Sequence, residues 1–314
     1  MKTPILYIVV PCYNEEECIS TTSSSLKKKI ASLEKKGKIS KDSKIVFIDD
    51  GSKDKTWSLI TDLSGPFIGI KLSRNRGHQN ALLAGLMYSK EHADICISID
   101  ADLQDDIDAI DKMVSAYSDG AEIVYGVRSS RKTDTWFKRT TAQSYYKLLN
   151  ILGVDVVYNA ADYRCMSRRA IDELSKYNEA NLFLRGIIPT LGFKTSTVEY
   201  ERHERIAGVS KYPLKKMLGL AWDGITSFSI KPIRLILDLG VLILFVSLAV
   251  VIYSIVQKII GNTVSGWTFV ICSIWLIGGL QLFAIGIIGE YIGKTYMETK
   301  NRPRYIIEKI HQSK

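Results

Sequence analysis

The sequence predicts an α/β domain built on a mostly parallel β-sheet, followed by a hairpin of two membrane-spanning helices. Three observations lead to this fold class. Short apolar runs rich in β-branched residues alternate with helical patterns through the first part of the chain. Several of these runs end in a cluster of polar residues. After Pro232 the composition changes abruptly to long apolar segments.

Five apolar runs are expected to form the strands of the sheet. They are Ile5–Val10, Ile45–Ile48, Ile68–Leu72, Ile95–Ile99 and Ile123–Val127. Helical patterns separate them, which favours parallel strands with both faces of the sheet covered. Ligands of such sheets bind beyond the carboxyl ends of the strands.

The first four runs are each followed by polar side chains. These clusters are Pro11–Glu16, Asp49–Ser52, Ser73–Gly77, and the group Asp100, Asp102 and Gln104. Four polar clusters at one edge of a sheet indicate a functional site at that edge.

The fourth cluster is typical of a site for a hard divalent cation. In an extended backbone, residues two apart point to the same side, so Asp100, Asp102 and Gln104 are expected to converge. Their oxygens would form half of a coordination shell and leave the other positions to phosphate oxygens and water. Taken alone, the stretch is equally compatible with a polar turn after a strand, and the neighbouring clusters favour the metal site.

Charge and cysteine content limit the class of protein. The 314 residues carry a formal net charge of +9, from 42 Lys and Arg against 33 Asp and Glu. This balance suits nucleic acid, an anionic membrane surface or phosphorylated ligands. No nucleic-acid-binding module is recognisable, so no nucleic-acid partner is expected. The five cysteines show neither metal-ligand spacing nor a disulfide framework, which is typical of free thiols in a reducing compartment or of small apolar side chains.

Two charge-free segments near the end of the chain predict membrane spans. Leu239–Val256 and Trp267–Ile288 each have about the length that crosses a hydrocarbon core. Basic residues flank the pair on its outer sides, whereas the connection between the spans carries only Lys258. By the positive-inside rule, both termini and the α/β domain are expected in the cytoplasm. Buried helices of a soluble protein are the alternative.

The predicted organisation has three parts. Residues 1–230 form the α/β domain, residues 231–293 the two spans, and residues 294–314 a basic cytoplasmic tail. The segment 212–230 mixes apolar residues, lysines and Trp222, as an interfacial helix does, and a helix buried against the α/β domain fits it equally well. Gly286, Gly289 and Gly293 form a face for close helix approach, either within the hairpin or in a homo-oligomer.

The order of these motifs resembles the family 2 glycosyltransferases of the GT-A fold. More closely, it resembles the polyprenyl-phosphate glycosyltransferases, which include bactoprenol glucosyltransferases and dolichol-phosphate mannose synthases. The motifs that carry the resemblance are Val9–Glu15, Ile48–Ser52, Asp100–Asp105 and Arg205–Tyr212, followed by the two spans. One departure is visible. The family usually has a proline soon after Asp-Leu-Gln, whereas this chain continues Asp105-Asp106-Ile107, so the shape of that turn stays open.

The resemblance implies a role for each motif. The first motifs would hold the nucleotide through Pro11, Tyr13, Asn14, Glu15, Asp49, Asp50, Ser52, Arg74 and Asp100. Asp100, Asp102 and Gln104 would hold Mg²⁺ or Mn²⁺ on the diphosphate. The phosphates would contact Arg128, Arg202, Arg205, Ser210 and Lys211. Asp102 and Asp162 would be the catalytic carboxylates, and Asp162 aligns with the residue often proposed as the family's base.

The implied reaction is inverting transfer of a monosaccharide from a nucleotide sugar to a polyprenyl phosphate. A phosphate monoester has a second pKa near 6 and is largely dianionic at neutral pH, so a strong base is not required. We therefore expect Asp162 to orient a reactant more than to remove a proton. Repulsion between the two phosphorylated reactants is the larger obstacle, because unit charges ~4 Å apart repel by roughly 4 kcal/mol at an effective dielectric constant of ~20.

The resemblance to bactoprenol enzymes favours UDP-glucose or UDP-N-acetylglucosamine as donor and undecaprenyl phosphate as acceptor. A mannose synthase that uses GDP-mannose is the alternative within the same class. A processive polysaccharide synthase is disfavoured, because its Gln-x-x-Arg-Trp motif and additional spans do not occur here. From a different class, a catalytically silent membrane scaffold or sugar-nucleotide sensor is disfavoured by the intact acidic cluster.

Overall fold

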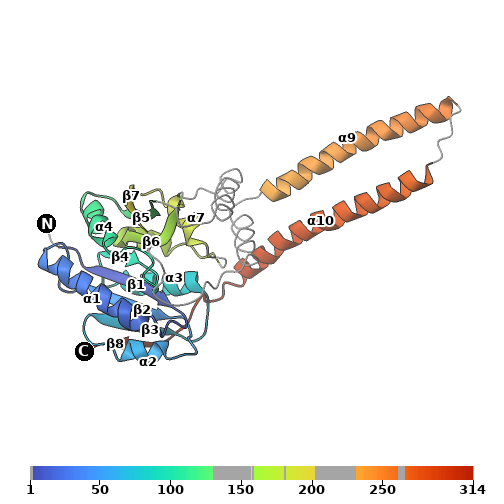
Figure 1. Cartoon of the computed structure of the whole chain (residues 1–314). Coiled ribbons are helices and arrows are strands. Elements are labelled where there is room, and N and C mark those ends of the chain that lie inside the picture. The colour runs from blue at the N-terminus through green and yellow to red at the C-terminus, as the bar shows by residue number, and fades with distance from the viewer. Residues whose placement is uncertain are drawn as a thin grey trace.

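The computed structural model describes residues 3–129, 157, 159–179, 182–201, 231–260 and 266–313. Within these residues, eight strands form one sheet in the order β7-β5-β6-β4-β1-β2-β3-β8 (Figure 1). The strands are β1 Leu6–Cys12, β2 Lys44–Asp49, β3 Phe67–Leu72, β4 Ile95–Ser98, β5 Ile123–Arg128, β6 Ala160–Ser167, β7 Thr195–Tyr200 and β8 Ile307–Gln312. The helices are α1 Ile19–Lys35, α2 Thr56–Thr61, α3 His78–Ser89, α4 Ala109–Ser118, α6 Arg168–Leu174, α7 Leu184–Thr190, α9 Lys231–Ile259 and α10 Trp267–Thr299.

The five predicted strands are confirmed, each to within two residues at either end. Strand β1 pairs in parallel with β2 and β4, β2 pairs in parallel with β3, and β5 pairs in parallel with β7. Strand β6 lies antiparallel between β4 and β5, and β8 lies antiparallel to β3. The sheet is therefore mostly parallel, with antiparallel pairing introduced by strands that the sequence did not predict.

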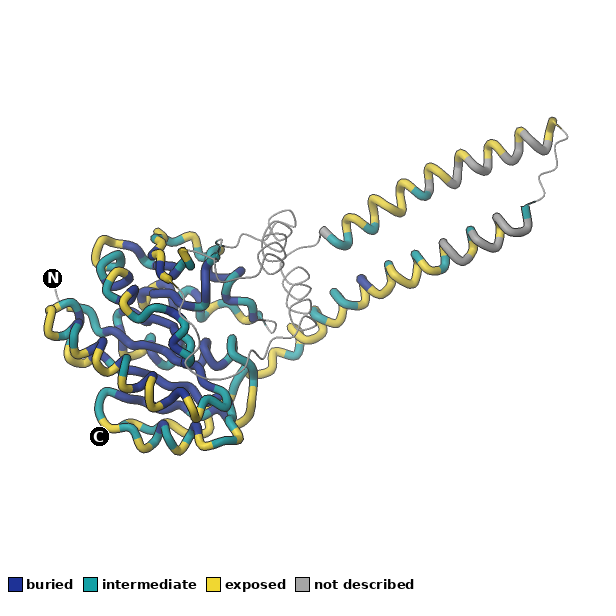
Figure 2. Tube along the Cα trace, in the orientation of Figure 1, coloured by how far each residue is buried: buried dark blue, intermediate teal, exposed yellow. Residues whose placement is uncertain are grey.

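Alternation along β1 separates two apolar cores. Leu6, Ile8 and Val10 point to one face of the sheet, where they pack with residues of α1, α2 and α4. Tyr7 and Val9 point to the other face, which α3, α6 and α7 cover. Figure 2 shows the resulting buried layer along the central strands. Because both faces are covered, the open positions for a ligand lie at the strand ends.

The loop after β4 differs from the extended backbone that the sequence predicted. Strand β4 ends at Ser98, residues 101–102 form a turn, and Leu103 has a φ of 49°. The strict two-residue alternation assumed for Asp100, Asp102 and Gln104 is therefore wrong. A turn, not a strand end, sets the directions of these side chains, and the Gln104 N–H donates to Asp102 Oδ1 at 3.2 Å.

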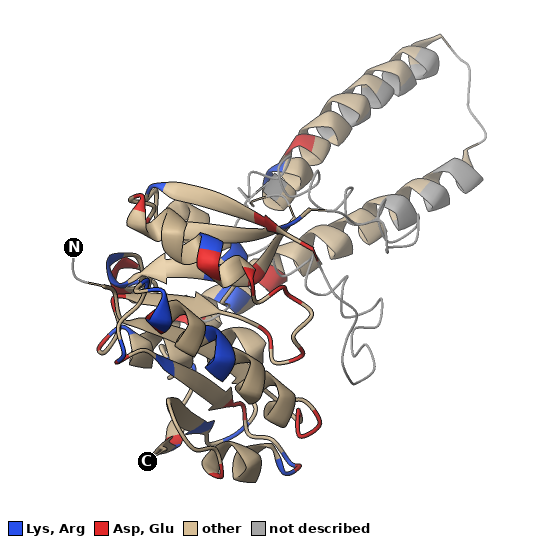
Figure 3. Ribbon diagram, turned by 60° about the vertical axis from the view of Figure 1, so that its left-hand side comes forward, with Lys and Arg blue, Asp and Glu red and all other residues tan. Residues whose placement is uncertain are grey.

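Helices α9 and α10 form a hairpin that projects from the sheet domain (Figure 1). The predicted spans lie inside these helices, and most of their described length carries no charged residue (Figure 3). Exposed apolar side chains on the hairpin include Leu242, Phe245, Ile274, Leu282 and Phe283. Over the described residues, however, no helix combines the length and apolarity required of a membrane span.

The glycine face of α10 does not mark a close helix contact in the described structure. A Cβ atom added at Gly286, Gly289 or Gly293 would meet no described atom within 4 Å. Packing within the hairpin, one of the two interpretations of these glycines, therefore finds no support among the described residues.

The predicted basic tail, residues 294–314, contains regular secondary structure. Residues 294–299 complete α10, and β8 adds an edge strand to the sheet of the α/β domain. The Ser73 N–H donates to the Ile306 carbonyl at 3.0 Å, and the Ser313 N–H donates to the Phe67 carbonyl at 3.1 Å. The sequence did not predict this strand, because its Ile307-Glu-Lys-Ile310 pattern has too few apolar positions to indicate a buried element.

Candidate functional site

The loops after β1 and β2 interlock through backbone and side-chain hydrogen bonds. The Asn14 N–H donates to Ser52 Oγ at 3.0 Å, and the Lys53 N–H donates to Asn14 Oδ1 at 2.9 Å. The Ser52 N–H in turn donates to Asp49 Oδ1 at 3.0 Å. Asn14 has a φ of 52°, a conformation that Asn tolerates better than most residues. The predicted nucleotide-binding residues Asn14, Asp49 and Ser52 thus lie together at one end of the sheet.

Asp50 joins this region to the loop after β3. Its carboxylate accepts hydrogen bonds from the Arg76 N–H at 2.7 Å and the Gly77 N–H at 2.9 Å. Burial raises the pKa of Asp50, and the two backbone donors oppose that rise. Gly51 makes the approach feasible, because its φ is 67° and a Cβ there would lie 2.6 Å from the Arg74 carbonyl carbon.

Three further predicted residues flank these loops. Pro11 is buried in β1 opposite Ile48, Tyr13 is half-buried, and Arg74 is exposed. The Glu15 N–H donates to Thr56 Oγ1 at 2.9 Å, which fixes the backbone of Glu15 against the start of α2. One buried oxygen, Asp49 Oδ2, has no hydrogen-bond partner among the described residues.

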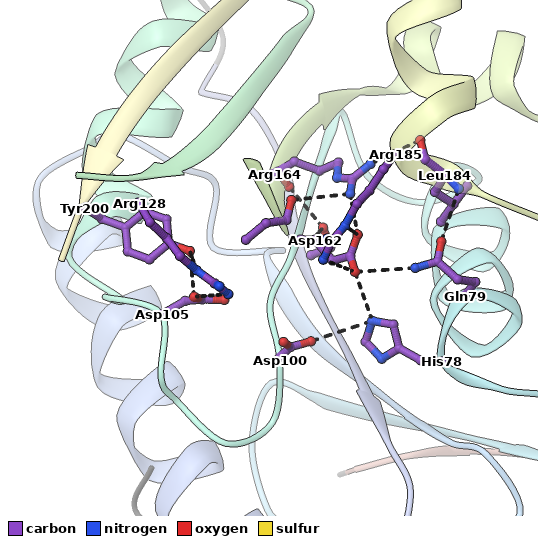
Figure 4. Close-up of polar contacts among 12 residues, drawn as sticks. His78, Gln79, Asp100, Asp105, Arg128, Asp162, Arg164, Leu184, Arg185 and Tyr200 are labelled. Atoms are coloured by element: carbon purple, nitrogen blue, oxygen red, sulfur yellow. Dashed lines mark hydrogen bonds and ion pairs between the residues drawn. The ribbon is translucent and has the colours of Figure 1, made fainter. Parts of the chain in front are cut away.

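Asp162, on β6, is surrounded by donors (Figure 4). Its Oδ1 accepts from Arg164 Nη2 at 2.6 Å and from Arg185 Nε at 3.1 Å. Its Oδ2 accepts from Arg185 Nη2 at 3.1 Å and from Gln79 Nε2 at 3.4 Å. Although burial alone would raise the pKa of Asp162, the Arg185 and Arg164 guanidinium groups hold it far below its usual range. A carboxylate held this way is a poor proton acceptor at neutral pH.

The elements around β6 explain this arrangement. Asp162 and Arg164 are two residues apart on one strand and so point to the same side. Arg185 comes from the start of α7, and the Leu184 N–H donates to Gln79 Oε1 at 3.2 Å, which ties α7 to α3. Arg164 is buried, with 2% of its side chain exposed, whereas Arg185 keeps 37%. The two arginines therefore differ in their access to a ligand.

His78, the first residue of α3, stands between the two acidic groups. Its Nε2 lies 3.6 Å from Asp100 Oδ1 and 3.8 Å from Asp162 Oδ2. Figure 4 shows the imidazole between the two carboxylates. The structure thus brings the predicted residues Asp100 and Asp162 to one site on either side of His78.

The donor set around Asp100 fits a hard divalent cation. Loss of hydration raises the pKa of Asp100, His78 opposes the rise, and the carboxylates Asp162 and Asp102 add to it. The side chain still exposes 44% of its surface, so a ligand can reach it. Crowded carboxylates are the ligands that Mg²⁺ and Mn²⁺ prefer. Among the described residues, no group of three or more His, Cys, Asp or Glu side chains is arranged as a ready metal site.

Arg128 lies outside this group of carboxylates. Its Nη2 is 3.7 Å from Asp105 Oδ1, and its Nε donates to the Tyr200 hydroxyl at 3.4 Å. The guanidinium predicted to contact phosphate is therefore engaged with a buried aspartate. The other predicted phosphate ligands, Arg202, Arg205, Ser210 and Lys211, lie outside the described residues, as does the segment 212–230.

Several residues of the site were missed from the sequence. The alternation of side chains along β6 places Arg164 on the same side as Asp162, but the sequence did not predict that strand. Gln79 and Arg185 stand in no motif, and only the packing of α3 and α7 brings them to Asp162.

Comparisons with known proteins agree with this arrangement. The glycosyl transferase family 2 profile matches residues 7–175, and the GtrB C-terminal hairpin profile matches residues 231–295. The chain is 54% identical over 308 residues to the uncharacterised glycosyltransferase YkoT of Bacillus subtilis (strain 168), covering 97% of this chain and 91% of that protein.

Two relatives have more specific names. The bactoprenol glucosyl transferase of Shigella phage SfII is 40% identical over 312 residues, covering 97% of this chain and 98% of the relative. The prophage bactoprenol glucosyl transferase homolog of Escherichia coli (strain K12) is 42% identical over 312 residues, covering 96% and 98%. The similarity therefore spans the sheet domain and the hairpin together.

Proposed function

Because the chain belongs to glycosyl transferase family 2 and carries a GtrB C-terminal hairpin, we propose that it transfers a monosaccharide from a nucleotide sugar to a polyprenyl phosphate. The observation that carries this proposal is the similarity to bactoprenol glucosyl transferases over nearly the whole chain. The donor that this similarity favours is UDP-glucose or UDP-N-acetylglucosamine, and the favoured acceptor is undecaprenyl phosphate.

The reaction is a single displacement with inversion. A phosphate oxygen of the lipid forms a bond to the anomeric carbon of the sugar as the bond from that carbon to the nucleotide diphosphate breaks. The acceptor oxygen is already ionised at neutral pH, so no side chain has to remove a proton. Arginine side chains bind both carboxylate oxygens of Asp162. Asp162 would therefore orient Arg185 toward the reactants and would be a poor general base.

Asp100, Asp102 and Gln104 would hold Mg²⁺ or Mn²⁺ on the donor diphosphate. When bound, the cation would neutralise charge on the departing nucleotide diphosphate. The loops that carry Asn14, Asp49 and Ser52 would bind the base and ribose. The acceptor phosphate would contact Arg202, Arg205, Ser210 and Lys211, because Arg128 is engaged by Asp105.

The hairpin supports a membrane-bound acceptor. Its exposed apolar side chains would lie in the bilayer, and the basic flanks of the predicted spans favour a cytoplasmic α/β domain. A polyprenyl tail would then stay in the membrane while its phosphate reaches the carboxyl ends of the strands.

A panel assay tests the proposal. The full chain in detergent is incubated with undecaprenyl phosphate and one labelled nucleotide sugar at a time, and the lipid product is identified by mass spectrometry. We expect a polyprenyl-phosphate monosaccharide from a UDP-sugar, formed about a thousandfold more slowly by the Asp102→Ala variant. A product only with GDP-mannose would replace the donor assignment. No lipid-linked product with any donor would overturn the proposed function.

A further inference from the structure

Two tyrosines hold the loop that follows Asp102 and Gln104. The Tyr200 hydroxyl donates to Asp105 Oδ1 at 2.6 Å, and the Tyr163 hydroxyl donates to the Asp106 carbonyl at 2.9 Å. The two rings pack edge to face, with centroids 5.2 Å apart and an interplanar angle of 79°. Together with Arg128, these residues form what we call the tyrosine clasp.

The clasp surrounds a buried carboxylate. The Asp105 side chain is only 3% exposed, and Arg128 supplies the cation 3.7 Å away. Burial and the neighbouring Asp105 charge raise the pKa of Tyr200, so the phenol stays neutral and remains the donor. A buried carboxylate that loses one such partner is strongly destabilised, because its lost hydration is no longer replaced.

The clasp also joins the ends of two strands. Arg128 and Tyr200 are register partners at the ends of β5 and β7. The Ser129 N–H and hydroxyl both donate to the Tyr200 carbonyl, at 3.0 and 3.1 Å. Figure 4 shows Asp105, Arg128 and Tyr200 as a group separate from the Asp162 cluster.

We propose that Asp105 is a positioning residue for the metal-binding loop of the transfer site. Through Tyr200 and Arg128, it fixes the loop of Asp102 and Gln104 relative to the ends of β5 and β7. This inference rests on the proposed function, because it takes this loop as the holder of the cation on the donor diphosphate.

A polar contact next to the opposite end of β5 provides a control. Glu122, just before the opposite end of β5, accepts a hydrogen bond from the Ser167 hydroxyl and lies 3.5 Å from Arg169 Nη1. It is also partly buried, with 27% of its side chain exposed, but it stands at the other end of the sheet from Asp102. Glu122→Gln therefore tests loss of an anchor without loss of the clasp.

The experiment compares Asp105→Asn, Tyr200→Phe and Glu122→Gln with the unmodified full chain in detergent. Binding of Mn²⁺ alone is followed by electron paramagnetic resonance of the free ion, and transfer kinetics are measured with the donor varied. Because residues that orient metal ligands typically affect metal affinity or activity by 10–100-fold, we expect Asp105→Asn and Tyr200→Phe to weaken Mn²⁺ binding and lower kcat, each by about tenfold. The donor KM should change much less, and Glu122→Gln should change neither quantity.

The outcomes distinguish failure of the positioning role of Asp105 from failure of the proposed metal role. Unchanged Mn²⁺ affinity and kcat in folded Asp105→Asn and Tyr200→Phe would overturn the positioning role alone. Equal losses in Glu122→Gln would also overturn it, because they would reflect general destabilisation. If Asp105→Asn does not fold, Tyr200→Phe, which removes one oxygen atom, decides the matter. Absence of Mn²⁺ binding by the unmodified chain would overturn the proposed metal role and the inference with it.

Discussion

Asp100 and Asp162 lie on either side of the same histidine, yet their surroundings are opposite. Asp162 has two guanidinium groups and an amide on its oxygens, and its pKa is far below the usual range. Asp100 has the His78 imidazole at 3.6 Å and two nearby carboxylates, and its pKa is raised. The charge of Asp162 is compensated by two guanidinium groups, whereas at Asp100 the effects of His78 and Arg185 are outweighed by burial and two neighbouring carboxylates.

This difference assigns the two acids different tasks. A carboxylate whose charge is compensated by buried arginines is part of the scaffold that orients them. A crowded and partly exposed carboxylate gains most from an incoming cation. The contrast therefore favours a metal at the Asp100 loop and a positioning role at Asp162, and four predictions test it.

The largest effect is expected at the Asp100 loop. Asp102→Ala should lower the transfer rate by about a thousandfold, because it removes electrostatic stabilisation of the departing diphosphate. Excess chelator should have the same effect on the unmodified chain, and added Mn²⁺ or Mg²⁺ should restore activity. Initial rates of lipid-linked product formation provide the measurement. Full activity in excess chelator would contradict the metal role of the Asp100 loop, and with it the different roles assigned to Asp100 and Asp162.

Asp162→Asn should keep measurable turnover while the protein loses stability. The substitution leaves Arg164 buried without its anion, which typically costs about 3–5 kcal/mol of unfolding free energy. Urea unfolding and transfer rates measured on the same preparation separate the two effects. A loss of activity as complete as in Asp102→Ala, with stability intact, would instead identify Asp162 as an obligatory base.

Arg185→Lys should have a smaller effect, because it keeps the charge but loses the two-point contact with Asp162. The loss of one hydrogen bond between charged groups corresponds to a decrease in rate of about tenfold. Lys176→Arg, a charge-conserving change in an exposed pair with Glu173, is the matched control and should be neutral. A rate unchanged by Arg185→Lys would remove Arg185 from the site.

The smallest effect concerns pH. The folded-state pKa of Asp162 is depressed, so its ionisation stabilises the fold above the unfolded pKa of about 3.9, and this contribution is lost as the pH falls below about 4. Thermal melts from neutral pH down to acid should show a steeper loss in the unmodified chain than in Asp162→Asn. Parallel pH profiles of the two proteins would show that the arginines do not depress this pKa.

The sequence was sufficient for the parts of the fold that have strong periodicity. Five parallel-type strands, dense in Ile and Val, were predicted to within two residues. Strand β6 was not predicted, because Asp162 and Arg164 interrupt its apolar pattern. In the structure these two charged side chains bind each other within the site. Strand β7 is an edge strand with exposed residues, so its sequence carries little apolar signal.

The site was predictable where it coincides with a motif and not where it depends on packing. Asp49, Asp50 and Asp100 stand at predicted strand ends and lie in the site. Gln79 and Arg185 reach Asp162 only because α3 and α7 cover the same face of the sheet. The turn after Asp-Leu-Gln, left open by the missing proline, is held by two tyrosines from β6 and β7.

The return of the chain into β8 has a consequence for folding. Strands β7 and β8 are the two outermost strands of the sheet, and the hairpin is inserted in the chain between them. Because β8 pairs with β3 from the first part of the chain, this edge of the sheet can be completed only after α9 and α10 have been synthesised. A chain that stopped at the hairpin would leave β3 as an exposed edge strand.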